Sequence, residues 1–272
     1  MDRVTALLRT VRNPAAPALG RWNLAEVATH LSHAWAVVSG LATENLSEVF
    51  DPPRHLDADG EAAVLSDLWE LPELTALGVE SDSERDLRVL ADRIEERAAT
   101  FLSSLRRSSP LDLRSWLVAG TKVRLSTLTC HLLNETIVHG YDVARADGRR
   151  WAIEPAHATL VMDQFLIPII QVLDPRALVD QEAAAGTRVT YELRVRGGGR
   201  HVFAFDDGAL TVEPSESSGR RIDCHISADP AALLLVAWAR KSQWAAIARG
   251  QLVAWGRKPW LGPKLRSMMR NP

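Results

Sequence analysis

The sequence predicts two domains, an all-helical bundle followed by a small α+β domain. Up to about Leu173, apolar side chains recur every three or four positions, which is the spacing of amphipathic helices. From Val189 onwards, apolar and polar residues alternate, which is typical of strands that bury one face. Asp174-Pro175 and a run of small residues separate the two patterns, so the domains are expected at 1–175 and 186–272.

Four helices are expected in the first domain. The first has the spacing of a capping box, because Asn23 is followed three residues later by Glu26. The third is expected to close at Asp147-Gly148 in the manner of a C-cap, and Pro168 is expected to kink the fourth. The four ranges are 23–40, 84–106, about 121–146 and 155–173.

Residues 44–83 contain a stretch with no clear periodic pattern. Asp51-Pro52-Pro53 breaks any helix there, and a short helix is expected from Glu61 to Trp69. The segment could cover a cleft as a lid or be a simple surface insertion, and the sequence favours neither.

The second domain is expected to be an antiparallel sheet with helices packed on it. Gly197 to Gly199 and Asp206 to Gly208 interrupt the alternation as turns. Asp229-Pro230 opens a helix that is expected to reach Arg240. The strands are expected at 189–195, 201–205, 209–213, 221–227 and 251–255, before a short closing helix.

Composition excludes several classes of partner. Lys plus Arg total 32 and Asp plus Glu total 34, so the chain lacks the excess of positive charge typical of proteins that bind nucleic acid or an anionic membrane. No apolar stretch is long enough to span a bilayer, and the N-terminus lacks the apolar core of a secretory signal. Cys130 and Cys224 form neither a disulfide framework nor a zinc ribbon, and are interpreted as reduced and structural. A cytoplasmic protein is therefore expected.

Two polar residues interrupt the apolar stripe of the helix expected at 121–146. Glu135 and His139 fall inside the stripe, four positions apart, so their side chains share one face. A buried carboxylate costs much desolvation energy unless a positive group compensates it. A metal ion held by both residues would do so, but a buried Arg or His139 itself would serve too. The stripe consists of Leu125, Leu128, Leu132 and Val143.

The helix at 23–40 offers a third ligand. His30 lies on the flank of its apolar stripe, whereas His33 lies nearly opposite the stripe and is expected to face water. With Glu135 and His139, His30 would complete a set of three ligands that leaves one position open, the pattern of catalytic zinc. The remaining histidines are interpreted as surface or core residues, and His131 is placed off its helix's stripe. They are His55, His131, His157, His201 and His225.

Two segments resemble the mycothiol-dependent maleylpyruvate isomerase family. One is RWNLAEVATHL, which contains Trp22 and His30, and the other is NETIVHGYDVARADGR, residues 134–149. The resemblance implies a DinB-like four-helix bundle with a His/Glu/His zinc site, followed by a small domain similar to sterol carrier proteins. It implies that His30, Glu135 and His139 are the zinc ligands. Residues 44–83 match no part of the family pattern, which leaves the maleylpyruvate substrate open.

The resemblance also points to two candidate catalytic residues. The family pattern has an acid at the position of Asp142, which could orient a ligand histidine or simply pair with Arg145. The family keeps an Arg in the second domain, and the best match here is Arg240, which would suit a carboxylate-bearing substrate or thiol. Arg249 or Arg257 could serve instead, and each could equally be a solvated side chain.

The expected chemistry is activation of a small thiol. Zinc makes a thiol a thiolate, and neither cysteine belongs to the expected site, so the thiol must come from a small molecule. The resemblance implies mycothiol, the thiol of actinobacteria. The thiolate would attack a small electrophile, either for cis–trans isomerisation or for S-transfer. The sequence does not separate these reactions, nor a monomer from a homodimer. The alternatives are apolar-ligand binding by the sterol-carrier-like domain, and a structural relic whose site holds only buried pairs.

Overall fold

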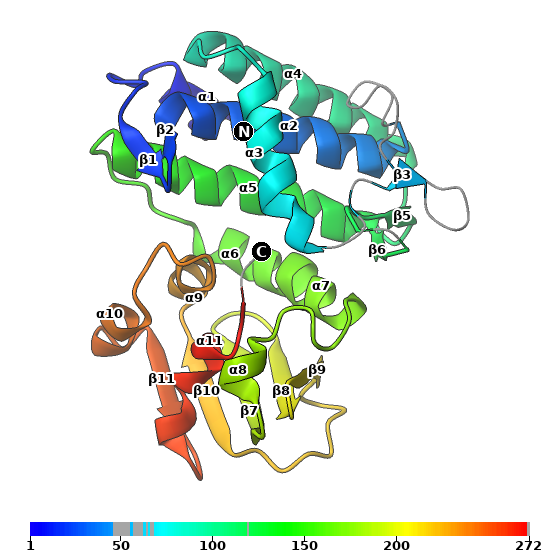
Figure 1. Ribbon diagram of the computed structural model, residues 1–272, viewed down its shortest axis with the longest axis vertical. Helices are drawn as coiled ribbons and strands as arrows, with labels where there is room; N and C mark the ends of the chain where they lie inside the picture. Colours follow the sequence, from blue (N-terminus) through cyan, green and yellow to red (C-terminus); the bar gives the residue numbers. More distant parts are fainter. Residues whose placement is uncertain (46–54, 57–61, 64, 66–67, 119, 271–272) are drawn as a thin grey trace. The chain divides into compact units, whose positions relative to one another are not determined.

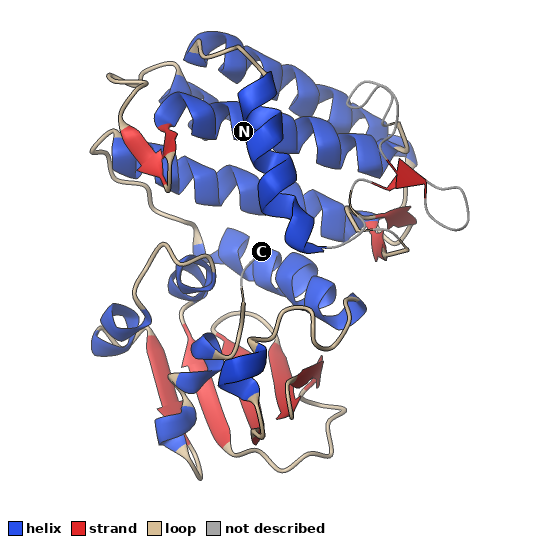
Figure 2. Ribbon diagram, viewed as in Figure 1, coloured by secondary structure: helices blue, strands red, loops and turns tan. Residues whose placement is uncertain are grey.

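The computed structural model describes residues 1–45, 55–56, 62–63, 65, 68–118 and 120–270. Its contacts divide the chain into two compact units, Met1–Ile153 and Glu154–Pro272, and each is described by itself. The first unit is mostly helical, and the second combines a sheet with short helices (Figures 1 and 2). The predicted fold class, helices followed by an α+β part, is therefore confirmed.

The first unit is built around three long helices, and a short N-terminal helix packs against two of them. The long helices are α2 (Leu24–Thr43), α4 (Leu87–Ser104) and α5 (Leu125–Ala146); the others are α1 (Asp2–Leu8) and α3 (Leu71–Ser81). Helix α1 contacts α4 and α5, and α3 contacts α2, which it crosses in Figure 1. Within the described residues, two-stranded ladders join β1 (Pro17–Leu19) to β2 (Trp22–Asn23), β3 (His55–Leu56) to β4 (Ala62–Ala63), and β5 (Leu113–Ser115) to β6 (Lys122–Arg124).

Helix α2 begins at the predicted capping box. The Asn23 side chain accepts the backbone N–H of Glu26, and the Glu26 carboxylate accepts the backbone N–H of Asn23. Such a cap contributes about 1 kcal/mol and fixes where the helix starts. Every residue of the predicted apolar stripe is buried. These are Leu24, Val27, Ala28, Leu31, Trp35 and Val38.

Helix α5 starts later than expected and ends as expected. Residues 122–124 pair with β5 as a strand, so the helix begins at Leu125 rather than near 121. At the other end, Gly148 has a φ of +73°, and the N–H of Arg149 donates to the Ala144 carbonyl at 2.7 Å. A glycine in this left-handed position closes the helix, as the sequence indicates.

The second unit contains a five-stranded sheet. The strands are β7 (Arg188–Val195), β8 (Arg200–Asp206), β9 (Ala209–Pro214), β10 (Cys224–Ala228) and β11 (Leu252–Trp255), in the order β11-β10-β7-β8-β9. The expectation of a purely antiparallel sheet is wrong in one place, because β10 lies parallel to β7. Short helices complete the unit: α8 (Gln181–Ala184), α9 (Pro230–Ala237), α10 (Gln243–Ala248) and α11 (Lys264–Ser267).

The fourth expected helix lies in the second unit. It is continuous from α6 (Pro155–Val161) through a π-helical turn, Met162–Leu166, into α7 (Ile167–Val172). Because α6 contacts α9 and α7 contacts β9, the boundary between the units falls at 153/154, earlier than the expected 175. The π turn lies directly before Pro168, which has no backbone N–H to donate to the preceding turn. The N–H of Ile167 donates to the carbonyl of Met162, five residues earlier, which is the bond of a π-helix.

Residues 46–54, 57–61, 64 and 66–67 of the 44–83 segment lie outside the described residues, so the choice between a lid and a surface insertion stays open. Within the described part, Ala62–Ala63 is strand β4 and a 3₁₀ turn spans Leu68–Glu70, so the short helix expected at 61–69 is not formed at those positions. Helix α3 follows directly. Among the described helices, none combines the length and the apolar character needed to cross a membrane.

Candidate metal centre

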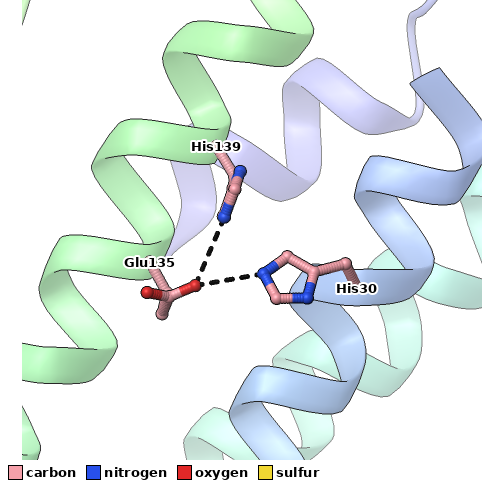
Figure 3. A group of neighbouring side chains, drawn as sticks. All are labelled: His30, Glu135 and His139. Carbon is pink, nitrogen blue, oxygen red and sulfur yellow. Dashed lines mark ion pairs between the residues drawn. The ribbon is translucent and has the colours of Figure 1, made fainter. Parts of the chain in front are cut away.

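His30, Glu135 and His139 converge inside the first unit. One ligand atom from each lies within 4.8 Å of the other two. Glu135 Oε2 is 3.3 Å from His30 Nε2 and 3.3 Å from His139 Nε2, so one carboxylate oxygen faces both imidazoles. Figure 3 shows His30 reaching from α2 toward Glu135 and His139, which lie one turn apart on α5. The helical spacing predicted this grouping, and the structure brings all three together.

The Glu135 carboxylate is buried and carries a charge. It is 9% exposed, and burial alone would raise its pKa, but hydrogen bonds from His139 and His30 hold the pKa well below its usual value. Among the described residues, its charged partners are histidines and not an arginine or lysine. The carboxylate is therefore ionised at neutral pH, and among the described residues its ion-pair partners are imidazoles.

His30 and His139 have opposite pKa shifts. Burial lowers the pKa of His30, so its imidazole is neutral at pH 7. Burial also acts to lower the pKa of His139, but hydrogen bonds to Asp142 and Glu135 overcome this and raise it to about 9. In the metal-free site, His139 thus carries the proton that balances Glu135.

Asp142 lies against His139 and not against Arg145. Its Oδ2 is 3.0 Å from His139 Nδ1, on the side of the ring that faces away from Glu135. Of the two roles that the sequence left open for Asp142, this contact is the one that orienting a ligand histidine requires.

Two aromatic contacts hold His30 in place. Its ring centroid is 5.3 Å from the Trp22 ring and 4.6 Å from His139, the latter edge to face. Trp22 belongs to β2, directly before the capping box that starts α2. The beginning of α2 therefore fixes both His30 and the indole beside it.

His131 belongs to the site, although the sequence interpretation placed it off the stripe. Its Nε2 is 3.6 Å from Glu135 Oε1, and the side chain is buried. Asn134 donates to the same oxygen at 3.2 Å. The signal that would have found His131 is its spacing, because it precedes Glu135 by the same four residues that separate Glu135 from His139.

His33 was expected to face water, but its side chain is only partly exposed, at 29%. Its Nε2 is 2.9 Å from Asp82 Oδ2, and a Cβ placed on Gly78 of α3 would lie 3.2 Å from its ring. Helix α3, which follows the irregular segment, therefore covers the side of α2 that sequence analysis assigned to solvent.

Arg240 lies in the second unit, beyond the end of α9. Its guanidinium donates to the Trp238 carbonyl at 2.7 Å. Of the two alternatives, Arg249 bonds the Ala245 carbonyl within its own helix, and Arg257 is 3.4 Å from Asp223. None of these contacts assigns a role in catalysis, so the role of Arg240 stays a prediction.

The donor set fits a zinc ion. Two imidazole nitrogens and one carboxylate oxygen converge from two helices, and imidazole with carboxylate suits Zn²⁺ and related divalent ions. The carboxylate at the centre is ionised, and each ligand histidine directs Nε2 at it. The ring nitrogen His139 Nδ1 is occupied by Asp142, which leaves Nε2 for coordination.

No family model matches the chain, and no curated protein matches it. Solved structures similar to it include a mycothiol-dependent maleylpyruvate isomerase, at 14% identity and a TM-score of 0.48, covering 93% of this chain and 87% of that one. A variant of an isomerase of the same description gives 13% identity and a TM-score of 0.46. The inverting sec-alkylsulfatase Pisa1 from Pseudomonas sp. is matched over 71% of this chain and 31% of its own, at 14% identity and a TM-score of 0.31.

Proposed function

We propose that this protein is a zinc-dependent enzyme that activates a low-molecular-weight thiol for attack on a small electrophile. The observation that carries the proposal is the convergence of His30, Glu135 and His139 on one point, with the carboxylate ionised and buried. Three protein donors leave room for a fourth ligand, which is the arrangement of catalytic zinc sites.

The thiol comes from outside the chain. Burial raises the pKa of Cys130 to about 11 and also raises that of Cys224, so neither forms a thiolate at neutral pH. Zinc, when bound, lowers the pKa of a coordinated thiol so that the nucleophilic thiolate predominates. Mycothiol is the thiol implied by the motifs around His30 and His139.

The chain's own residues then have separate tasks. His30, Glu135 and His139 hold the ion, and Asp142 keeps the proton of His139 on Nδ1, so that Nε2 presents its lone pair. Trp22 lies against His30, with the ring centroids 5.3 Å apart, and helps to hold that imidazole in place. Arg240 is the candidate for binding a carboxylate of the thiol or of the electrophile.

Metal analysis of the full chain tests whether the protein binds zinc, on which the proposal depends. Protein stripped with a chelator and then given zinc should retain one ion per chain, counted by mass spectrometry after desalting. Glu135→Gln keeps the shape of the side chain and removes its charge, and should lose the ion. His157→Ala is the matched control, because His157 is exposed on α6, and it should bind zinc like the parent. A parent protein that takes up no zinc would refute the proposal.

The reaction itself is either cis–trans isomerisation or S-transfer. Incubation with mycothiol and candidate electrophiles, followed by mass spectrometry, separates them. A stable conjugate indicates S-transfer, whereas an isomer of the electrophile with mycothiol recovered unchanged indicates isomerisation. Neither product above the level given by Glu135→Gln would contradict the proposed activity while leaving zinc binding intact.

A further inference from the structure

The two oxygens of the Glu135 carboxylate have different surroundings. Oε2 faces the two ligand histidines, at 3.3 Å from each Nε2. Oε1 faces away from them, toward His131 Nε2 at 3.6 Å and the Asn134 amide nitrogen at 3.2 Å. One oxygen of the carboxylate, Oε2, therefore faces the proposed metal, and the other, Oε1, faces the protein.

The protein side is built into α5. His131 precedes Glu135 by one turn, a spacing that puts both side chains on one face of the helix. Asn134, the residue before Glu135, reaches the same carboxylate with its side-chain amide at 3.2 Å. Both side chains are buried, His131 at 8% exposed and Asn134 at 2%. We expect both side chains to keep these rotamers, because moving away would leave the buried oxygen Glu135 Oε1 with fewer hydrogen-bond partners.

Building on the proposed function, we infer that His131 and Asn134 are positioning residues that keep Glu135 a one-oxygen ligand. With Oε1 engaged by the protein, only Oε2 is offered to the ion. The ion then has three protein donors, and the position that a second carboxylate oxygen would occupy is available to the thiol sulfur. The two residues act through Glu135 and are not ligands.

Cobalt loading provides a readout that does not depend on activity. Co²⁺ in place of zinc absorbs strongly in the visible when four-coordinate and weakly when it has five or six ligands. The parent should give the strong bands, and these should shift when a small thiol is added. The variants His131→Leu and Asn134→Leu should still bind one ion per chain but lose most of the visible absorption, because Oε1 swings onto the metal.

X-ray absorption of the zinc-loaded protein gives the matching structural measurement. The parent should show the outer-shell scattering of two imidazole rings, and each Leu variant should keep both rings and gain one near light-atom scatterer, since nitrogen and oxygen are not distinguished. His131→Gln, whose amide can donate to Oε1, should restore the parent spectrum. His33→Leu is the control for loss of a half-buried histidine elsewhere, and should leave both spectra unchanged. Having two separate Leu variants keeps the test open if one of them fails to fold.

The outcomes distinguish this inference from the proposed function. A parent that binds neither metal refutes both. A parent that binds metal while both Leu variants keep its cobalt bands refutes the positioning role alone. If His131→Leu loses the scattering of one imidazole ring, His131 is itself a ligand of the ion. That result also overturns the inference but leaves the metal centre in place.

Discussion

His139 Nδ1 lies 3.0 Å from Asp142 Oδ2, one turn further along α5, while the opposite ring nitrogen faces Glu135. Both carboxylates are buried, at 3% exposed for Asp142 and 9% for Glu135. The imidazole is therefore held from two sides by groups on its own helix. A contact of this kind sets which nitrogen carries the proton and fixes the plane of the ring.

Removing the charge of Asp142 should weaken metal binding without abolishing it. The Asn side-chain oxygen in Asp142→Asn can still accept the hydrogen bond of His139 Nδ1–H, but the negative charge that strengthens His139 as a ligand is lost, so zinc affinity should fall by about 10- to 100-fold. A competition titration against a chelating dye measures this. Asp163→Asn is the matched control, since Asp163 contacts His201 at 3.3 Å in the second unit, and its zinc affinity should equal that of the parent. Equal affinities in all three proteins would contradict a role for Asp142.

The stability of the metal-free protein should depend on pH with a maximum near pH 6.5. His139 has a folded pKa of about 9, above its unfolded value of 6.5, so its contribution is present below 6.5 and lost as pH rises through 9. The loss is on the order of 3 kcal/mol for a shift of this size. His30 and His131 have lowered pKa values, so protonating them below pH 6.5 favours unfolding. Denaturant titrations of chelator-treated protein between pH 5 and 9 would detect this maximum, and stability that rises steadily to pH 9 would contradict it.

Above pH 6.5, zinc affinity should rise with pH, whereas the stability of the metal-free protein should fall. Coordination requires neutral His139, so binding at pH 7 releases its proton, and affinity should rise about tenfold per pH unit until pH 9. Calorimetry in buffers of different ionisation enthalpy counts the released protons. The expected number is about one at pH 7. Zinc binding without proton release would place the proton elsewhere than on His139.

Two members of the His30–Glu135–His139 cluster could be predicted from sequence because they interrupt a regular pattern. Glu135 and His139 stand where α5 should be apolar, and a polar residue there needs a partner. His131 was missed because the apolar residues alone underestimate the buried face of this helix. Thr127, Cys130 and Asn134 are buried as well, so the stripe is wider than its leucines indicate.

Features that depend on distant contacts could not be predicted in the same way. Alternation of side chains identifies strands β7 and β10 but not that they lie parallel, because the direction is set by the connection between them. Helical spacing likewise identifies the helix from Pro155, while its assignment to the second unit rests on contacts with α9 and β9. The cover over His33 comes from α3, which follows a segment without periodicity.

The residue after His139 should tolerate no side chain. Gly140 lies against Trp151, and a Cβ on this glycine would overlap the indole ring. The indole is held in turn by its hydrogen bond to the Ile137 carbonyl at 3.1 Å and by Arg3, whose guanidinium lies 3.8 Å from the ring centroid. Gly140→Ala should therefore cost about 1–3 kcal/mol of unfolding free energy. Denaturant titration measures it. Gly219→Ala, where nothing lies within 4 Å, should change stability little, and an equal cost at both positions would contradict this explanation.

The end of α9 should gain stability from a glycine. Ala239 has a φ of +57° and is exposed, its N–H donates to the Val236 carbonyl at 3.1 Å, and the N–H of Arg240 donates to the Leu235 carbonyl at 2.7 Å. This closes the helix with a left-handed residue, a position where a Cβ costs about 1–2 kcal/mol. Ala239→Gly removes that cost but makes the unfolded chain more flexible, so a net gain of about 1 kcal/mol is expected.

The control for Ala239→Gly is Ala245→Gly in the middle of α10, which should cost about 0.5–1 kcal/mol because its backbone is helical. Denaturant titration followed by tryptophan fluorescence compares the two with the parent. The opposite signs are the informative result, since both variants make the same chemical change. A loss of stability in Ala239→Gly would mean that the left-handed backbone before Arg240 carries no strain.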